Sequence, residues 1–442
     1  MKKLFLRTGL FAGLAMSTIA LASCGGSNEV QLKDADGNTY KVAVTEDSDT
    51  VSKAMVLAAA NATKGEQKQY AFSVDASVDA KITLEMEGIK GTITAGAKAF
   101  VGASIGKDAY KAYEMGEEGY AEADFTEATA ALKKGLGFLA TADANVKFSD
   151  VAVNEKSEVW ADAPAEALAE TKTRVAGYNG KGATAKVRAF LNDGTFYAER
   201  CIGRFAAKEL ADTEKDAEYN YYGKTALPLD EMSPMLATAL HDFQTKSYSE
   251  FLEAYLPMLS DMGLPVQLPE ELPTFEVNKA FFESDNYETI TKVVKALGVK
   301  ISAINGSNVT FAVDITGNEV KEAVKAVSPA AVLMLPADLA TDKTILSVSV
   351  TMNAVKGLVS QVKVSTEAVD VLASVVYQAV EMVISNMFGV KAMVNHLAVE
   401  KSATPWDSLS GTFKFEANFK YDADVKVAAT PNSNLTYEEM ND

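Results

Sequence analysis

Residues 70–87 place the strongest constraint on the fold, because apolar and polar side chains alternate there without an interrupting Gly or Pro. A period of two is typical of a β-strand with one buried and one wet face. At about 3.3 Å per residue this strand would extend for roughly 56 Å, so it is expected to coil strongly around other elements. The apolar set is Tyr70, Phe72, Val74, Ala76, Val78, Ala80, Ile82, Leu84 and Met86.

The same alternation recurs along the chain, and helical patterns separate its instances. A turn at 88–91 leads into a second alternating stretch at 93–101, and Asn305-Gly306 is a dipeptide that favours a hairpin turn. Strands followed by inserted helices predict an α+β fold, with long, strongly curved antiparallel sheets (half-barrel-like) packed on amphipathic helices. Further strands are expected at 299–303, 309–315, 346–352 and 413–427, and helices at 50–63 and near 125–140, 163–176, 232–262, 278–297, 317–327 and 367–389.

The N-terminus has the three parts of a bacterial export signal. Lys2, Lys3 and Arg7 precede an uncharged stretch at 8–23, which is shorter than the roughly 20 apolar residues of a membrane-spanning helix. The four residues Leu21-Ala22-Ser23-Cys24 then resemble the bacterial lipobox. In proteins with that motif the cysteine thiol receives a diacylglyceryl group, with acyl chains such as palmitate, and becomes the mature N-terminus. The alternative is a plain signal peptide with an incidental cysteine.

The anchor and the charge together predict where the protein resides. A lipidated Cys24 would hold it in the cell envelope, on the extracytoplasmic side of a bacterial membrane. The formal net charge of −18 argues against nucleic-acid binding and against attraction to anionic headgroups, so attachment to the membrane would depend on the acyl chains. With Cys24 lipidated, Cys201 has no cysteine partner, and we expect a buried, inert thiol there.

The length of the mature chain favours two domains, because single cores rarely grow beyond about 250–300 residues. Three prolines cluster within residues 263–275, which we interpret as a linker; the alternative is a rigid loop that crosses one large curved sheet. The predicted organisation is a signal peptide at 1–23, a tether and small hairpin at 24–49, a first curved-sheet region at 50–262, the linker at 263–275 and a second curved-sheet region at 276–442.

The sequence contains partial matches to motifs for catalysis or metal binding, but the residues or elements around each match do not suit that function. Residues 34–38 have the acids of a calcium loop, but Thr39 stands where that loop requires Gly, which favours turn chemistry. The glycines at 180–185 match a dinucleotide fingerprint, yet the expected helix precedes them instead of following. His241 and His396 are too far apart for a histidine-rich metal site. We therefore predict neither an enzyme nor a bound metal or cofactor.

The helix expected at 367–389 combines a wide apolar band with a narrow polar stripe. One interpretation is a helix that simply packs in the core, and another is a helix that covers an apolar cavity. The second interpretation makes five of its residues candidate ligand contacts: Leu372, Val376, Val380, Val383 and Met387.

The order of these features resembles that of the lipoprotein carriers of the LolA and LppX type. The resemblance concerns the lipid anchor, the N-terminal helix, the long alternating strands and the apolar helices inserted later. It implies an incomplete β-barrel that wraps apolar helices around a lipid-binding cavity, and thus a carrier or sensor of a lipid or other hydrophobic ligand. The alternatives are a surface lipoprotein with a structural or adhesive role and, with less support because βαβ alternation is missing, the solute-binding lipoprotein of an importer.

Overall fold

The computed structural model of the 442-residue chain describes residues 29–64, 71–106, 125–205, 214–215, 220–246, 250, 254, 277–327, 329, 332, 341–371, 408–422, 425 and 427–440. The predicted signal peptide, Cys24, the predicted linker at 263–275 and most of the helix expected at 367–389 lie outside these residues.

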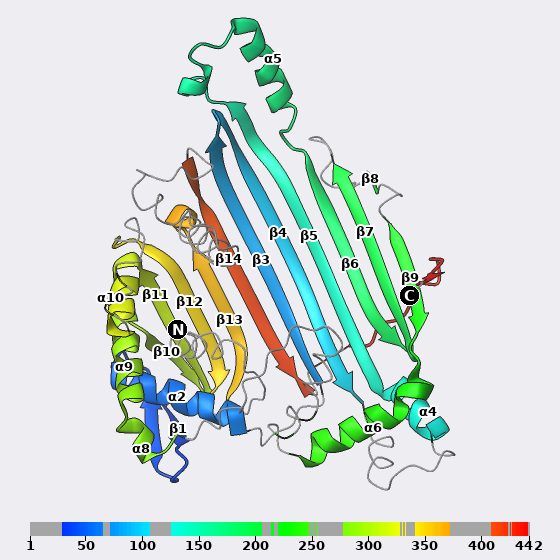
Figure 1. Cartoon of the computed structure of the whole chain (residues 1–442), viewed down its shortest axis with the longest axis vertical. Coiled ribbons are helices and arrows are strands. Elements are labelled where there is room, and N and C mark those ends of the chain that lie inside the picture. Colours follow the sequence, from blue (N-terminus) through cyan, green and yellow to red (C-terminus); the bar gives the residue numbers. More distant parts are fainter. Residues whose placement is uncertain are drawn as a thin grey trace, which may run out of the picture.

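The described residues form a small two-stranded sheet and one 13-stranded sheet that is open at both ends (Figure 1). Neighbouring strands of the large sheet are antiparallel, except for the short parallel pair of β15 with β9. The fold is therefore a mixture of α and β with a large antiparallel sheet; the strong curvature expected from the strand lengths is not confirmed. In spatial order the strands are β10 (Lys300–Asn305), β11 (Asn308–Thr316), β12 (Thr344–Asn353), β13 (Leu358–Thr366), β14 (Ser408–Tyr421), β3 (Ala71–Met86), β4 (Ile89–Ile105), β5 (Leu136–Val153), β6 (Gly182–Asn192), β7 (Thr195–Phe205), β9 (Tyr221–Ala226) and β15 (Glu438–Glu439), while β8 (Glu214–Lys215) pairs with β7.

Strands from both predicted regions belong to this one sheet. The seam is the pair of β14 with β3, whose register runs without a shift from Ser408 opposite Glu85 to Tyr421 opposite Phe72. An unbroken ladder of this length satisfies the backbone hydrogen-bonding groups of both strands. A single sheet thus continues from the second region into the first.

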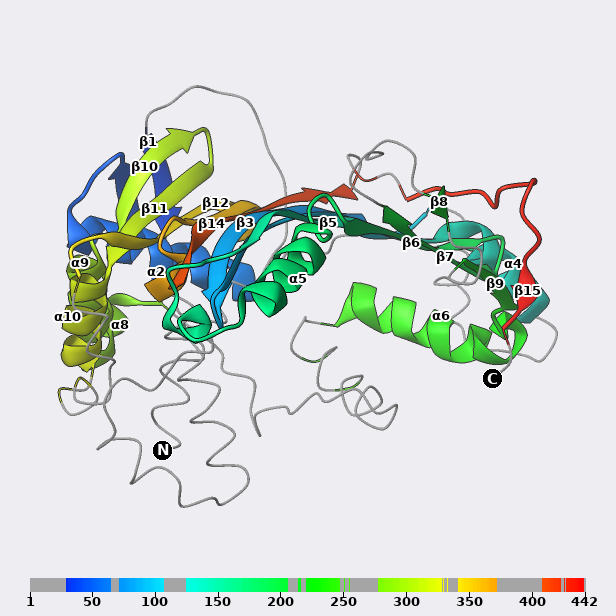
Figure 2. The ribbon, with the colours of Figure 1, turned by 90° about the horizontal axis from the view of Figure 1, so that it is seen from above.

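The helices lie at the ends of the sheet and on one of its sides. In the edge-on view, α5 and α6 lie on the side opposite to the C-terminal segment, which is drawn in red (Figure 2). Local sequence sets their ends: Ser284 caps α9 by accepting a hydrogen bond from the backbone N–H of Tyr287, and Gly298 ends it with a left-handed φ of 67°. The bounds are α2 (Ser48–Lys64), α4 (Phe125–Gly135), α5 (Ala165–Ala176), α6 (Leu229–Thr245), α8 (Lys279–Phe282), α9 (Asp285–Leu297) and α10 (Gly317–Val327).

The helix expected at 278–297 is divided into α8 and α9, and two further boundaries differ clearly from the sequence-based expectation. The helix expected near 125–140 ends at Gly135, and β5 begins at the next residue. The alternation expected to run to Val427 ends as a strand at Tyr421, because Asp422 adopts a left-handed φ of 49° and turns the chain away from the ladder. The predicted hairpin at Asn305-Gly306 is confirmed, since Asn305 pairs with Asn308 and Gly306 has a φ of 60°.

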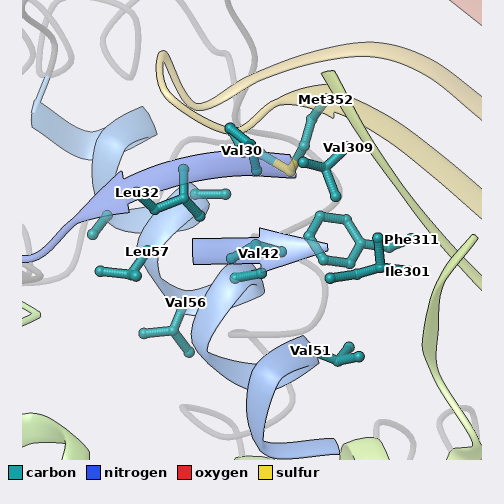
Figure 3. Close-up of a cluster of buried hydrophobic side chains, with 14 of the residues drawn as sticks. Val30, Leu32, Val42, Val51, Val56, Leu57, Ile301, Val309, Phe311 and Met352 are labelled. Carbon is teal, nitrogen blue, oxygen red and sulfur yellow. The ribbon is translucent and has the colours of Figure 1, made fainter. Parts of the chain in front are cut away.

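The largest cluster of buried apolar side chains lies at one corner of the molecule. There the two-stranded sheet of β1 (Glu29–Lys33) and β2 (Thr39–Ala43) meets α2, α9 and the strands β10 to β12 (Figure 3). Leu32 and Leu57 are 1% exposed and Val309 is fully buried. A second, smaller cluster joins α4 to α6. The long strands between these two clusters have no comparable core among the described residues.

Candidate functional site

The register of the long strands sorts their side chains onto two chemically different faces. Residues directly opposite each other in an antiparallel pair point to the same side. Because Val78 lies opposite Ala97, Ala97 opposite Ala144 and Ala144 opposite Ala185, the apolar positions of β3 align with those of the next three strands. This apolar face comprises the even-numbered residues from Phe72 to Met86, the odd-numbered ones from Ile93 to Ile105, the even-numbered ones from Phe138 to Phe148, and Ala183, Ala185, Val187, Ala189 and Leu191.

None of these apolar-face side chains on β3, β4, β5 or β6 is buried. The exposed fraction is 45% for Val187, 41% for Val101 and 37% for Phe72. The expectation that the apolar face of residues 70–87 is buried is therefore wrong for the described residues of this strand. The alternation predicted the face correctly, but alternation carries no information about what covers a face.

The middle of the apolar face is made almost entirely of alanine. Flanking residues are larger, with Phe72, Phe138 and Leu191 toward one end of the strands and Ile82, Ile93 and Phe148 toward the other. Small side chains between larger ones leave a low strip that crosses the strands at a right angle. We name this strip the alanine band; it consists of Ala76, Ala80, Ala95, Ala97, Ala99, Ala140, Ala142, Ala144, Ala183, Ala185 and Ala189.

Two arginines of β7 lie opposite apolar-face residues of β6: Arg200 opposite Val187 and Arg204 opposite Ala183. The row of opposite residues runs from Ala76 through Ala99 and Ala142 to Val187, and then to Arg200. Arg200 is exposed, and its guanidinium carbon lies 5.8 Å from the ring centroid of Tyr221, the next residue of the row on β9. A cation over an aromatic ring is held by the quadrupole of that ring. The apolar row thus ends at a positioned positive charge.

The opposite face of the same strands is polar and carries ion pairs between neighbouring strands. Lys186 of β6 lies 3.3 Å from Asp143 of β5, and Lys363 of β13 lies 3.8 Å from Glu416 of β14. Opposite charges on directly paired residues favour the observed register. Toward β6 and β7 this face also carries apolar side chains: Phe190 lies opposite Leu139, stacks on Tyr197 and is fully buried.

The C-terminal segment lies on the polar face. Val427 is only 5% exposed and sits over Gly102 and Gly137; a Cβ at these two glycines would lie 2.5 and 2.8 Å from its methyl carbons. Glycine is required at both positions for this close approach. The apolar face is consequently the side on which α5 and α6 lie (Figure 2).

Tyr437 fixes the far end of the same segment. Its hydroxyl donates a 2.6 Å hydrogen bond to Glu199, and its ring makes an edge contact at 5.0 Å with Tyr197. Desolvation and the bond to Glu199 raise the pKa of Tyr437 above its usual value. Arg188 donates to the backbone carbonyl of Thr430. Through these contacts the C-terminal segment packs on the polar face.

The five ligand contacts expected on the helix at 367–389 cannot be placed on this face. Leu372, Val376, Val380, Val383 and Met387 lie outside the described residues, as does the predicted lipidation site Cys24. Sequence reasoning did not single out Val187 or Arg200. The signal that could have found Val187 is the alternation of Ala183, Ala185, Val187, Ala189 and Leu191, which alanine weakens but does not erase.

The remaining sequence candidates are not among the apolar-face residues of β3 to β6. His241 is in α6 beside Asp242, and Cys201 is on the polar face opposite Lys186, half-buried where a buried thiol was expected. The carboxylate of Asp34 accepts hydrogen bonds from Asn38 and from the hydroxyl of Tyr40, which confirms turn chemistry. Within the described residues, no group of three or more His, Cys, Asp or Glu side chains is arranged to hold a metal ion.

No family model, curated protein or solved structure matches this chain. Among the helices that the structure describes, none combines the length and the apolar character required to cross a membrane.

Proposed function

We propose that this chain is a lipid-anchored protein of the bacterial cell envelope that binds a lipid or another hydrophobic ligand on the apolar face of its open sheet. One observation carries the proposal: the apolar-face side chains of β3 to β6 are all at least partly exposed, whereas the polar face is partly covered by the C-terminal segment. Apolar surface gains about 25 cal/mol for each Å² removed from water, so this face favours a hydrophobic occupant.

The lengths of the strands support a ligand that lies across several of them. β3, β4 and β5 have 16, 17 and 18 residues, more than a sheet needs to close a small core. In the carriers that this chain resembles, such strands form an incomplete barrel around a lipid. We accordingly propose that the long strands curve around the bound ligand, on the side where α5 and α6 lie.

The lipid anchor is part of the same proposal. A negatively charged chain is repelled by anionic headgroups, so it needs acyl chains at Cys24 to stay at the membrane. Cys24→Ser is expected to abolish acylation and to leave an unprocessed precursor. A Cys24→Ser protein that still partitions into detergent at the mature size would refute the anchor.

The binding test uses the anchor-free chain from residue 25 onward and a fluorescent fatty acid. We expect saturable binding by this chain and at least a tenfold loss in Val101→Asp, because the change places a charge where the ligand removes water. Thr94→Asp is the matched control, since Thr94 is an exposed residue of the same strand on the polar face. It should bind the probe as the unsubstituted chain does.

Two results would contradict the binding proposal. The unsubstituted chain could fail to bind the probe, which would favour the structural or adhesive role. Alternatively, Val101→Asp and Thr94→Asp could weaken binding equally, which would place the ligand elsewhere.

A further inference from the structure

We infer that the C-terminal segment, residues 427–440, can leave its own sheet and pack in the same way on a second copy of this protein, so that two chains exchange the segment. The partner is a second copy because that molecule carries the identical segment and the identical groups that bind it. The inference concerns association between copies and does not depend on the proposed ligand.

The first argument is the conformation of Asp422, which follows β14 and leads toward the segment. Apolar and polar residues alternate in the sequence from Phe413 to Val427, a pattern typical of one continuous strand. The strand ends at Tyr421, because Asp422 takes a left-handed φ of 49° and its carbonyl accepts a 3.0 Å hydrogen bond from the backbone N–H of Val425. Left-handed backbone is unfavourable for residues other than glycine, although Asp tolerates it better than most. A straight backbone at Asp422 would keep the chain in the plane of the sheet and lift the segment off the polar face.

The second argument is the way in which the polar face holds the segment. Two side chains anchor it: Val427 is buried over two glycines of β4 and β5, and Tyr437 donates a 2.6 Å hydrogen bond to Glu199. Between them, Arg188 donates a 3.2 Å hydrogen bond to the backbone carbonyl of Thr430. Most residues of the segment are exposed. The segment is thus held by a few contacts, as a bound peptide is, and an identical segment from another chain can make all of them.

The third argument is the edge strand β9, which the end of the segment covers only in part. Within the described residues, β15 pairs in parallel with two residues of β9, Gly223 and Lys224. The ion pair between Lys224 and Glu439 is 3.1 Å long and exposed, so it contributes little. Pairing at a sheet edge uses backbone groups, and the same pairing therefore forms with β15 of either chain.

The exchanged form keeps these contacts and differs from the structure in two respects. The backbone at Asp422 is extended instead of left-handed in both chains, and two chains must associate. The cost of the left-handed turn at Asp422 therefore decides between the two forms, and the protein concentration shifts the balance.

The test changes Asp422 in opposite directions and measures the dimer dissociation constant of the anchor-free chain by analytical ultracentrifugation. Asp422→Val places a β-branched residue where a left-handed φ is strongly unfavourable, and we expect it to lower that constant roughly tenfold or more. Asp422→Gly accepts the left-handed backbone without strain and should raise the constant above that of the unsubstituted chain.

Two further experiments show whether the dimer forms by exchange. Adding Tyr437→Ala to Asp422→Val removes one anchoring side chain and should weaken the dimer roughly tenfold or more. In the second experiment, Asp422→Val chains with Lys224→Cys are mixed with Asp422→Val chains with Glu439→Cys, both in a Cys201→Ser background. Oxidation should link one chain of each kind, because exchange places these two positions opposite each other.

Three results would overturn the inference: an Asp422→Val chain that folds but stays monomeric, a dimer that Tyr437→Ala does not weaken, and mixed cysteine variants that form no linked dimer. Unfolding midpoints of all variants verify that the fold is intact. If Asp422→Val does not fold, the cysteine variants are mixed with Asp422 unsubstituted and at high protein concentration. Linked pairs then support the exchange, and their absence overturns it.

Discussion

The corner around α2 and the long strands β3 to β6 are built on opposite principles. At the corner, side chains from two sheets and two helices converge, and Leu32, Leu57 and Val309 are at most 1% exposed. In the long strands, backbone ladders connect one strand to the next while the apolar side chains stay accessible. The large buried clusters among the described residues therefore lie away from the accessible apolar face of the long strands. That surface is consequently available for another role.

The largest expected effect is a loss of stability at the corner. It is tested by substituting one leucine of the corner and one leucine of the long strands. Leu57→Ala should lower the free energy of unfolding by about 2–5 kcal/mol, since it empties a filled site in the corner cluster. Leu84→Ala, on the apolar face of β3, should cost less than about 1 kcal/mol because its side chain is already partly in water. Denaturant titration of the anchor-free chain measures both values.

Equal losses in the two leucine variants would break the comparison. They would mean that the apolar face of β3 is as tightly packed as the corner, and that no surface remains for a ligand. The slope of the titration should stay constant between variants, so that the change in midpoint reports stability alone.

Much of the sheet could be predicted from the sequence, because alternation is a local signal. The period of two placed β3 within one residue at each end, and Asn305-Gly306 placed the hairpin of β10 and β11. Gly182–Asn192 is a strand preceded by a helix, which is the order expected around the glycines at 180–185. β5 was missed because its many alanines are equally compatible with a helix, and α4 leads directly into it.

The candidate site could be predicted only in part, because it depends on pairing between distant segments. β14 joins β3 across more than 300 residues, and no local pattern specifies that partner. Arg200 becomes the end of an apolar row only through four successive strand pairings. The exposure of the row depends on where the C-terminal segment and the helices lie, which is a property of the whole fold.

The second prediction concerns the seam, which is the pair of β14 with β3. Gly411 of β14 lies so close to β3 that a Cβ there would overlap the carbonyl oxygen of Lys81 and approach Cα of Ile82 to 2.9 Å. Gly411→Ala should therefore cost about 1–3 kcal/mol of unfolding free energy, because backbone atoms must move to admit the methyl group. Denaturant titration measures this loss.

Gly96→Ala is the matched control for the seam, since Gly96 is also a strand glycine of the large sheet. Its nearest neighbour would be the flexible amide of Asn145 at 3.2 Å, so we expect a change within about 0.5 kcal/mol. A Gly411→Ala chain as stable as the Gly96→Ala chain would show that the seam is looser than the ladder implies.

The smallest expected effect is on the pH dependence of the free energy of unfolding. It is tested with one carboxylate of the corner, Asp34, and one of the long strands, Asp143. Burial by itself raises the pKa of Asp34, but hydrogen bonds from Asn38 and Tyr40 outweigh it and hold the pKa below the usual value. A lowered pKa in the folded state means that the ionised group stabilises the fold above the unfolded value near 3.9, and that this contribution is lost as the pH falls through the folded pKa.

Asp34→Asn should accordingly cost about 1 kcal/mol at pH 6, and the difference from the unsubstituted chain should shrink below about pH 4. Asp143→Asn serves as the control from the open sheet, because its ion pair with Lys186 is exposed and such pairs contribute little. We expect it to stay within about 0.5 kcal/mol of the unsubstituted chain across the same range. Urea titrations at pH 3, 4 and 6 give both profiles. A pH-independent loss in Asp34→Asn would mean that the turn depends on the shape of this side chain and not on its charge, and would remove this electrostatic difference between the corner and the open sheet.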